Sequence, residues 1–148
     1  MVSRSSEPPS IVVVDDDPQI RDLIGRCLIE FGASVTPCED AFAAVEVIKI
    51  VQPDVVLADL VMPGRYGLDL LYEIRSWGAE HGGDVPAIVI TGLHDPDLES
   101  EIRKGGFGYL AKPFTPIKLF NTIIQALGLL PPPKRTLAES PVLAHSAS

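Results

Sequence analysis

The chain has 148 residues, and 46% of them are hydrophobic, which suits one compact domain with a sizeable core. Its formal net charge is −8, so direct binding to nucleic acid, which needs clustered Lys and Arg, is disfavoured. No apolar run approaches the roughly 20 residues that span a bilayer, and the polar start lacks the apolar centre of an export signal. We therefore expect a cytoplasmic protein without membrane insertion, in which Cys27 and Cys38 are reduced thiols.

Composition divides the chain into three parts. Residues 1–9 predict a flexible lead, and residues 10–128 predict a folded domain. Residues 129–148 are rich in Pro, Ser and Ala and lack periodicity, which is typical of a disordered tail. Within the folded part, strand and helix signals alternate five times, which indicates βαβ units and a parallel sheet.

Hydrophobic patterning and turn residues predict the individual elements. Short apolar runs predict five strands: Ile11–Val14, Ser34–Cys38, Val55–Ala58, Ala87–Ile90 and Phe107–Ala111. Apolar residues at helical spacing predict a helix after each strand: Pro18–Phe31, Ala41–Ile50, Leu68–Arg75, Asp95–Lys104 and Pro116–Leu127. Asp17 can cap the first helix, and Pro37 makes the second strand an edge strand. The last helix is expected to bury Leu119, Phe120, Ile123, Ile124 and Leu127.

Polar side chains follow four of the five predicted strands. Asp15 and Asp16 follow the first strand, Asp59 the third, Thr91 the fourth and Lys112 the fifth. Because ligands of such sheets bind at the carboxyl ends of the strands, we expect these side chains to lie together. A solvated acidic turn that caps the next helix would explain the first two residues, but not the joint occurrence of all five.

Three carboxylates, a hydroxyl and an ammonium suit phosphoryl transfer, which needs positioning and charge neutralisation. Asp15 and Asp16 are the expected Mg²⁺ pair, because this hard cation takes oxygen ligands. Asp59 stands alone on the central strand and is the best candidate for a nucleophile that forms an acyl phosphate. Thr91 can donate to one phosphate oxygen, and Lys112 can neutralise another.

Four fragments in this order resemble the receiver domain of two-component response regulators. They are Val13–Asp17, Asp59–Gly64, Thr91–Gly92 and Tyr109–Phe114, and the resemblance covers about residues 10–128. It implies a flavodoxin-like, CheY-like fold, in which five helices cover a doubly wound five-stranded parallel sheet of order 2-1-3-4-5. The folded part would then be a receiver domain.

The resemblance also implies roles for the site residues. Asp59 would accept a phosphoryl group from a histidine kinase or a histidine phosphotransfer protein. Asp16, Asp59 and the carbonyl oxygen of Val61 would ligate Mg²⁺, with Asp15 acting through water, while Thr91 and Lys112 would hold the phosphoryl oxygens. The peptide bond after Lys112 is expected to be cis, as X–Pro bonds can be.

A switch follows from the same resemblance. On phosphorylation Thr91 would move toward the phosphate, and Tyr109 would turn into the space left behind. The surface formed by the fourth helix, fifth strand and fifth helix would change and be recognised by a downstream protein target, or serve as a dimer interface. Such a device is a local charge event that biases a two-state element.

Three positions depart from the pattern or tune it. Tyr66 stands where the family often has an acidic residue, which alters the loop above the site. Val61 and Leu93 occupy positions that influence phosphate lifetime in this family, and both are apolar. Since neither can orient an attacking water, we expect slow self-hydrolysis.

The leading interpretation is a stand-alone receiver that is not an enzyme, apart from phosphotransfer to, and slow hydrolysis from, its own Asp59. A piece of a larger protein, with the Pro-rich tail as the start of a linker, is the variant of this interpretation. The alternative is a small haloacid dehalogenase-like phosphatase that uses Asp15 and Asp17 as its D-x-D pair, which would leave Asp59 unexplained. A receiver that binds partners without phosphorylation is a third alternative, disfavoured by the full set of site residues.

Overall fold

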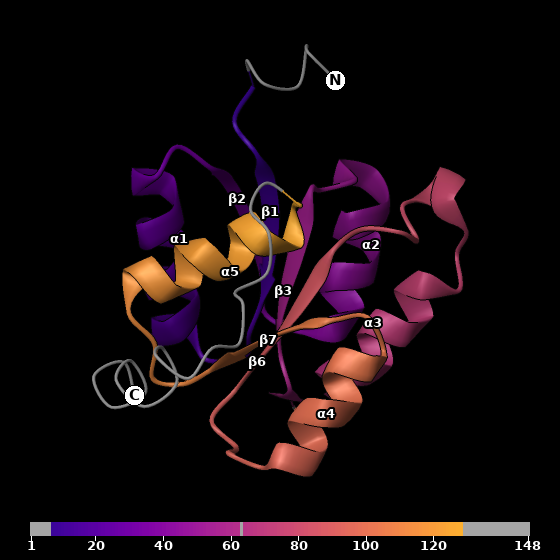
Figure 1. Cartoon of the computed structure of the whole chain (residues 1–148). Coiled ribbons are helices and arrows are strands. Elements are labelled where there is room, and N and C mark those ends of the chain that lie inside the picture. The colour runs from indigo at the N-terminus through magenta and orange to yellow at the C-terminus, as the bar shows by residue number, and fades with distance from the viewer. Residues whose placement is uncertain (1–6, 63, 129–148) are drawn as a thin grey trace.

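The computed structural model describes residues 7–62 and 64–128, and a parallel sheet of five strands forms its centre (Figure 1). Its strands are β1 (Ser10–Val14), β2 (Ser34–Cys38), β3 (Val55–Asp59), β6 (Ala87–Thr91) and β7 (Gly108–Ala111). Their order across the sheet is β2-β1-β3-β6-β7, and every pairing is parallel. When only the five strands of this sheet are numbered along the chain, their order is 2-1-3-4-5, and the predicted flavodoxin-like topology is confirmed.

Helices cover both faces of the sheet (Figure 1). They are α1 (Pro18–Glu30), α2 (Ala41–Val51), α3 (Gly67–Arg75), α4 (Pro96–Lys104) and α5 (Pro116–Ala126). Residues of α1 and α5 pack in one apolar cluster, and residues of α2, α3 and α4 pack in the other. Side chains of β1 alternate between these clusters, with Val12 in one and Val13 in the other, which is why both faces of this strand are apolar.

The predicted helix starts are present. Asp17 Oδ1 accepts a hydrogen bond from the Gln19 N–H at 2.9 Å and caps α1. Thr115 Oγ1 caps α5 in the same way, through the Lys118 N–H at 3.1 Å. These side chains satisfy backbone donors that the first helical turn leaves without a partner.

Burial along α5 differs from the prediction. Leu119 and Ile123 are buried, but Phe120, Ile124 and Leu127 are only half-buried. The prediction that the whole apolar face is buried was therefore wrong. Phe120 of α5 instead stacks on Phe31, the residue that follows α1, with ring centroids 4.2 Å apart.

Three short elements had no sequence signal. β4 (Val61–Met62) pairs with β5 (Arg65–Tyr66) in a two-residue antiparallel ladder, and a 3₁₀ turn, η2 (Ala79–His81), precedes β6. Two-residue strands are too short for periodicity to be read.

Other sequence-based expectations concern the thiols, the membrane and the termini. Cys27 and Cys38 are free thiols, as expected. Within the described ranges, no helix combines the length and hydrophobicity needed to cross a membrane. The predicted tail, and residues 1–6 of the predicted lead, lie outside the described residues.

Candidate functional site

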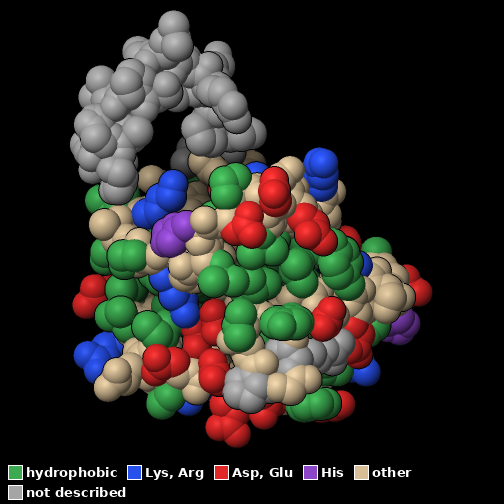
Figure 2. All heavy atoms as spheres, turned by 90° about the horizontal axis from the view of Figure 1, so that it is seen from below, with side chains coloured by type: hydrophobic (Ala, Val, Ile, Leu, Met, Phe, Trp, Pro, Cys, Tyr) green, Lys and Arg blue, Asp and Glu red, His purple; other side chains and the backbone are tan. Residues whose placement is uncertain are grey.

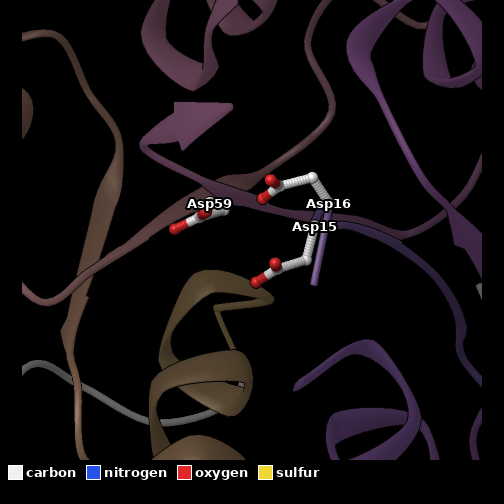
Figure 3. Close-up of side chains that lie close together, drawn as sticks. All are labelled: Asp15, Asp16 and Asp59. Atoms are coloured by element: carbon white, nitrogen blue, oxygen red, sulfur yellow. The ribbon is translucent and has the colours of Figure 1, made fainter. Parts of the chain in front are cut away.

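Three carboxylates from two neighbouring strands meet at one end of the sheet. One oxygen from each of Asp15, Asp16 and Asp59 lies within 4.8 Å of the others. The parallel register pairs Val14 of β1 with Ala58 of β3, so the residues that follow them, Asp15 and Asp59, reach the same edge. Figure 3 shows the three carboxylates turned toward one space. The prediction that the carboxylates of Asp15, Asp16 and Asp59 lie close together is confirmed.

Burial and like charge disfavour ionisation of two of these acids. Asp15 is 1% exposed and Asp59 is 9% exposed, whereas Asp16 is exposed. Burial, followed by the neighbouring charge of Asp15, raises the pKa of Asp59 to about 6, although Lys112 opposes the shift. Burial also raises the pKa of Asp15. Two smaller effects lower it: the Asp17 N–H donates a hydrogen bond to Asp15 Oδ1 at 2.9 Å, and the charge of Lys112 lies nearby.

Lys112 supplies positive charge to this cluster. Its Nζ lies 3.3 Å from Asp59 Oδ1 and 3.6 Å from Asp15 Oδ2. The backbone N–H of Lys112 donates to the Thr91 carbonyl at 2.8 Å, which holds the residue at the end of β7. The peptide bond between Lys112 and Pro113 is cis, as expected. Asp15 Oδ2 is buried and has no hydrogen-bond donor among the described residues. The single ammonium of Lys112 therefore leaves this oxygen without a hydrogen bond.

Thr91 and Tyr109 are linked through the backbone of Leu93. Thr91, at the end of β6, is 2% exposed, and its Oγ1 accepts a hydrogen bond from the Leu93 N–H at 3.0 Å. The half-buried Tyr109 of β7 donates its hydroxyl proton to the Leu93 carbonyl at 3.1 Å. Arg103 of α4 lies over the Tyr109 ring, 5.6 Å from its centroid. These contacts join Thr91, through Leu93, to Tyr109 of β7 and Arg103 of α4.

The site lies at an open surface. Figure 2 views the molecule toward the carboxyl ends of the strands, where acidic side chains gather and hydrophobic side chains lie beside them. Three large hydrophobic residues near these strand ends are well exposed: Val61 at 52%, Leu93 at 51% and Tyr66 at 59%. Val61 belongs to β4, two residues beyond Asp59 in the chain.

Two residues at the site were missed by the sequence analysis. Arg21 of α1 donates from Nη1 to the Asp15 carbonyl at 2.7 Å. Gly67 begins α3, and a Cβ there would overlap the carbonyl oxygen of Asp59. A glycine at a predicted helix start was a signal for the second residue, but the sequence held no signal for the Arg21 contact.

A family model, the response regulator receiver domain, matches residues 11–124 of this chain. The chain belongs to this family. Phosphorylation-dependent switching is the general role of receiver domains in two-component signalling. This match agrees with the fold and with the acidic cluster described above.

Individual relatives and solved structures agree with this assignment. The chain is 33% identical over 123 residues to an uncharacterized 14.6 kDa protein of Leptolyngbya boryana, covering 82% of this chain and 92% of that protein. It is 33% identical to the sensor protein GacS of Pseudomonas syringae, covering 88% of this chain but 15% of that protein. The chemotaxis protein CheY4 of Vibrio cholerae has a TM-score of 0.74 and 25% identity, covering 80% of this chain and 98% of that chain.

The share of each relative that this chain covers differs widely. The chain spans most of the Leptolyngbya protein, but only 14% to 52% of seven other curated relatives that it matches. The similarity to these seven relatives is therefore limited to a part of each protein.

Proposed function

We propose that this receiver domain is a phosphorylation-controlled switch whose Asp59 accepts a phosphoryl group from a phosphohistidine of a partner protein. The observation that carries the proposal is the cluster of Asp15, Asp16 and Asp59 at the carboxyl ends of the strands, with Lys112 beside Asp15 and Asp59. The partner would be a histidine kinase or a histidine phosphotransfer protein. The similarity to a sensor protein supports a kinase of this kind.

The chemistry of the acids fits a magnesium ion. Three carboxylates face a single ammonium, and Asp15 Oδ2 is buried without a hydrogen bond in the described part of the chain. A divalent cation would relieve both features, and Mg²⁺ prefers such oxygen ligands together with waters and phosphate oxygens. Asp16, Asp59 and the Val61 carbonyl would hold it directly, with Asp15 acting through water. When bound, it supplies charge neutralisation for the phosphoryl oxygens.

The transfer itself replaces one bond to phosphorus by another. An oxygen of the Asp59 carboxylate attacks, the P–O bond forms and the P–N bond of the phosphohistidine breaks. The electron pair of that bond returns to the imidazole ring. Lys112 and the Thr91 hydroxyl are placed to hold the phosphoryl oxygens, which is the positioning that such transfers need. Beyond this self-directed reaction and the slow hydrolysis of the phosphoryl group, which returns the Asp59 carboxylate and releases inorganic phosphate, no enzymatic role is proposed.

The proposed output is a change in the surface formed by α4, β7 and α5. Thr91, drawn toward the phosphoryl group, would release the Leu93 N–H, and Leu93 also accepts the hydroxyl of Tyr109. Tyr109 would then reorient and change the surface offered to a downstream protein in the cytoplasm or to a second copy of the chain. This couples a local charge change to a two-state element.

No observation favours the phosphatase alternative. The Asp17 carboxylate caps α1 through the Gln19 N–H, so it is engaged away from the acids of the site. The phosphatase alternative also gives no role to Asp59, which lies beside Lys112.

Phosphorylation with a small donor tests the proposal. The full chain is incubated with acetyl phosphate, with and without Mg²⁺, and its intact mass is measured. We expect the gain of one phosphoryl group only with Mg²⁺, no gain in Asp59→Asn, and a normal gain in Asp97→Asn, a control on the exposed part of α4. Equal labelling of wild type and Asp59→Asn would overturn the proposal, and steady turnover of p-nitrophenyl phosphate would favour a phosphatase.

A further inference from the structure

Asp16 is the acid of the cluster that lacks an anchor of its own. Its side chain is exposed, and no described residue donates a hydrogen bond to its carboxylate. Yet one of its oxygens lies within 4.8 Å of those of Asp15 and Asp59. Without such a donor, the place of its carboxylate beside the other acids depends on the position of the backbone that carries it.

The backbone before Asp16 is fixed on two sides. The Asp15 N–H donates to the Cys38 carbonyl at 3.1 Å, which extends the pairing of β1 with β2 by one residue. The Asp15 carbonyl accepts from Arg21 Nη1 at 2.7 Å. Because this carbonyl and the Asp16 N and Cα atoms belong to one planar peptide unit, a hold on the oxygen also fixes the Cα of Asp16.

Arg21 is suited to this task by its place in α1. It lies in the second turn, its backbone N–H donates to the Asp17 carbonyl at 3.0 Å, and its side chain is half-buried. Its positive charge also reaches Cys38, whose pKa it lowers against the larger effect of burial. The guanidinium, which donates to the Asp15 carbonyl, stays charged at every working pH.

We propose that Arg21 is a positioning residue for the magnesium site, which holds the Asp15 carbonyl so that the Asp16 carboxylate stays beside Asp15 and Asp59. This inference rests on the magnesium site of the proposed function. Arg21 touches neither the metal nor the phosphoryl group. It orients the metal ligands before the metal binds, as outer-shell partners of metal ligands commonly do.

Magnesium binding without any phosphoryl donor tests this role. The full-length variants are Arg21→Met, Arg21→Lys and Arg26→Met, the last a control on the exposed face of the same helix. Mg²⁺ is titrated alone and followed by the amide NMR signals of Asp16 and Asp59. We expect Arg21→Met to weaken Mg²⁺ binding about tenfold, the low end of what losing an outer-shell partner costs. Arg21→Lys should fall between Arg21→Met and wild type, and Arg26→Met should match wild type.

Two further measurements separate positioning from general structure. In metal-free buffer, the amide of Asp17, which donates to Asp15 Oδ1, should exchange faster in Arg21→Met than in Arg26→Met. The thermal unfolding midpoints of all variants should stay close to that of wild type. Should Arg21→Met fail to fold, Arg21→Lys decides the question, because weaker Mg²⁺ binding supports the proposal and wild-type binding overturns it.

The outcomes distinguish this inference from the proposed function. Wild-type Mg²⁺ affinity in Arg21→Met, or an equal loss in Arg26→Met, overturns the role of Arg21 and leaves the phosphorylation of Asp59 intact. Absence of Mg²⁺ binding in the wild-type protein overturns both.

Discussion

Lys112 Nζ lies 3.3 Å from Asp59 Oδ1, although 53 residues separate them in the chain. In the sheet, β6 lies between β3, which ends at Asp59, and β7, which Lys112 follows, so the contact reaches across the end of β6. The ammonium is the charge that lowers the pKa of Asp59 against burial and the repulsion of Asp15. In the proposed transfer, the ammonium would therefore favour the ionised carboxylate that attacks and would also face the phosphoryl oxygens.

Replacing this ammonium should make Asp59 harder to ionise. In Lys112→Met, the pKa of Asp59 should rise above its wild-type value of about 6, because both lowering effects of the lysine are lost. Labelling by acetyl phosphate near neutral pH should slow, since a protonated carboxyl is a poor nucleophile. A carbon-detected NMR titration of the Asp59 carboxyl gives the pKa directly. Lys118→Met, on an exposed position of α5, is the matched control, and an equal change there would contradict the prediction.

The same pKa shift predicts how stability depends on pH. Burial raises the pKa of Asp59 from 3.8 to about 6, so the folded protein holds this proton more tightly than the unfolded chain does. Ionised Asp59 is therefore destabilising, and its effect is absent below about pH 4, grows as pH rises and is complete above about pH 6. In metal-free buffer near neutral pH, Asp59→Asn should raise the free energy of unfolding by about 1–3 kcal/mol.

Urea unfolding at two pH values measures this effect. The advantage of Asp59→Asn should vanish near pH 4 and should shrink at neutral pH when Mg²⁺ offsets the charges of the wild-type site. If Asp59→Asn raised the free energy of unfolding equally at both pH values, the loss of the Asp59 charge would not be the cause of the gain.

Much of this site could be predicted because its residues stand at strand ends. A buried run such as Val55–Ala58 fixes where a strand stops, and parallel connections bring all such stops to one edge. Asp59 and Lys112 could thus be placed together without any knowledge of side-chain geometry. What could not be predicted depends on packing between elements. The guanidinium of Arg21 reaches a carbonyl six residues earlier, and Gly67 faces the backbone of Asp59, and neither contact has a sequence period.

The exposed apolar side chain of Val61 predicts a long-lived phosphoryl group. Val61 is 52% exposed beside the site and has no group that can orient a water molecule for attack on phosphorus. Val61→Asn should speed loss of the phosphoryl group roughly tenfold, less than a general base contributes, because an amide only orients the water. The decay of the labelled fraction, followed by intact mass after removal of the donor, gives both rates. A lifetime of seconds in wild type that Val61→Asn leaves unchanged would contradict this role.

Gly67 allows α3 to approach the backbone of Asp59 closely. Its N–H donates to the Leu60 carbonyl at 2.7 Å, and a Cβ at this position would overlap the Asp59 carbonyl oxygen, which is backbone and cannot rotate away. Gly67→Ala should therefore lower the free energy of unfolding by about 1–3 kcal/mol, as overpacking does, despite the better helix propensity of alanine. Since relief of the overlap shifts Asp59 or α3, labelling by acetyl phosphate should slow as well.

Gly92 provides the matched control for this substitution. It follows Thr91 at the end of β6, and a Cβ there meets no atom within 4 Å. Gly92→Ala should keep the wild-type free energy of unfolding or raise it slightly, because alanine restricts the unfolded chain. Urea denaturation of both variants checks the contrast. If Gly67→Ala is as stable as Gly92→Ala and keeps the wild-type labelling rate, the close approach of α3 does not position Asp59.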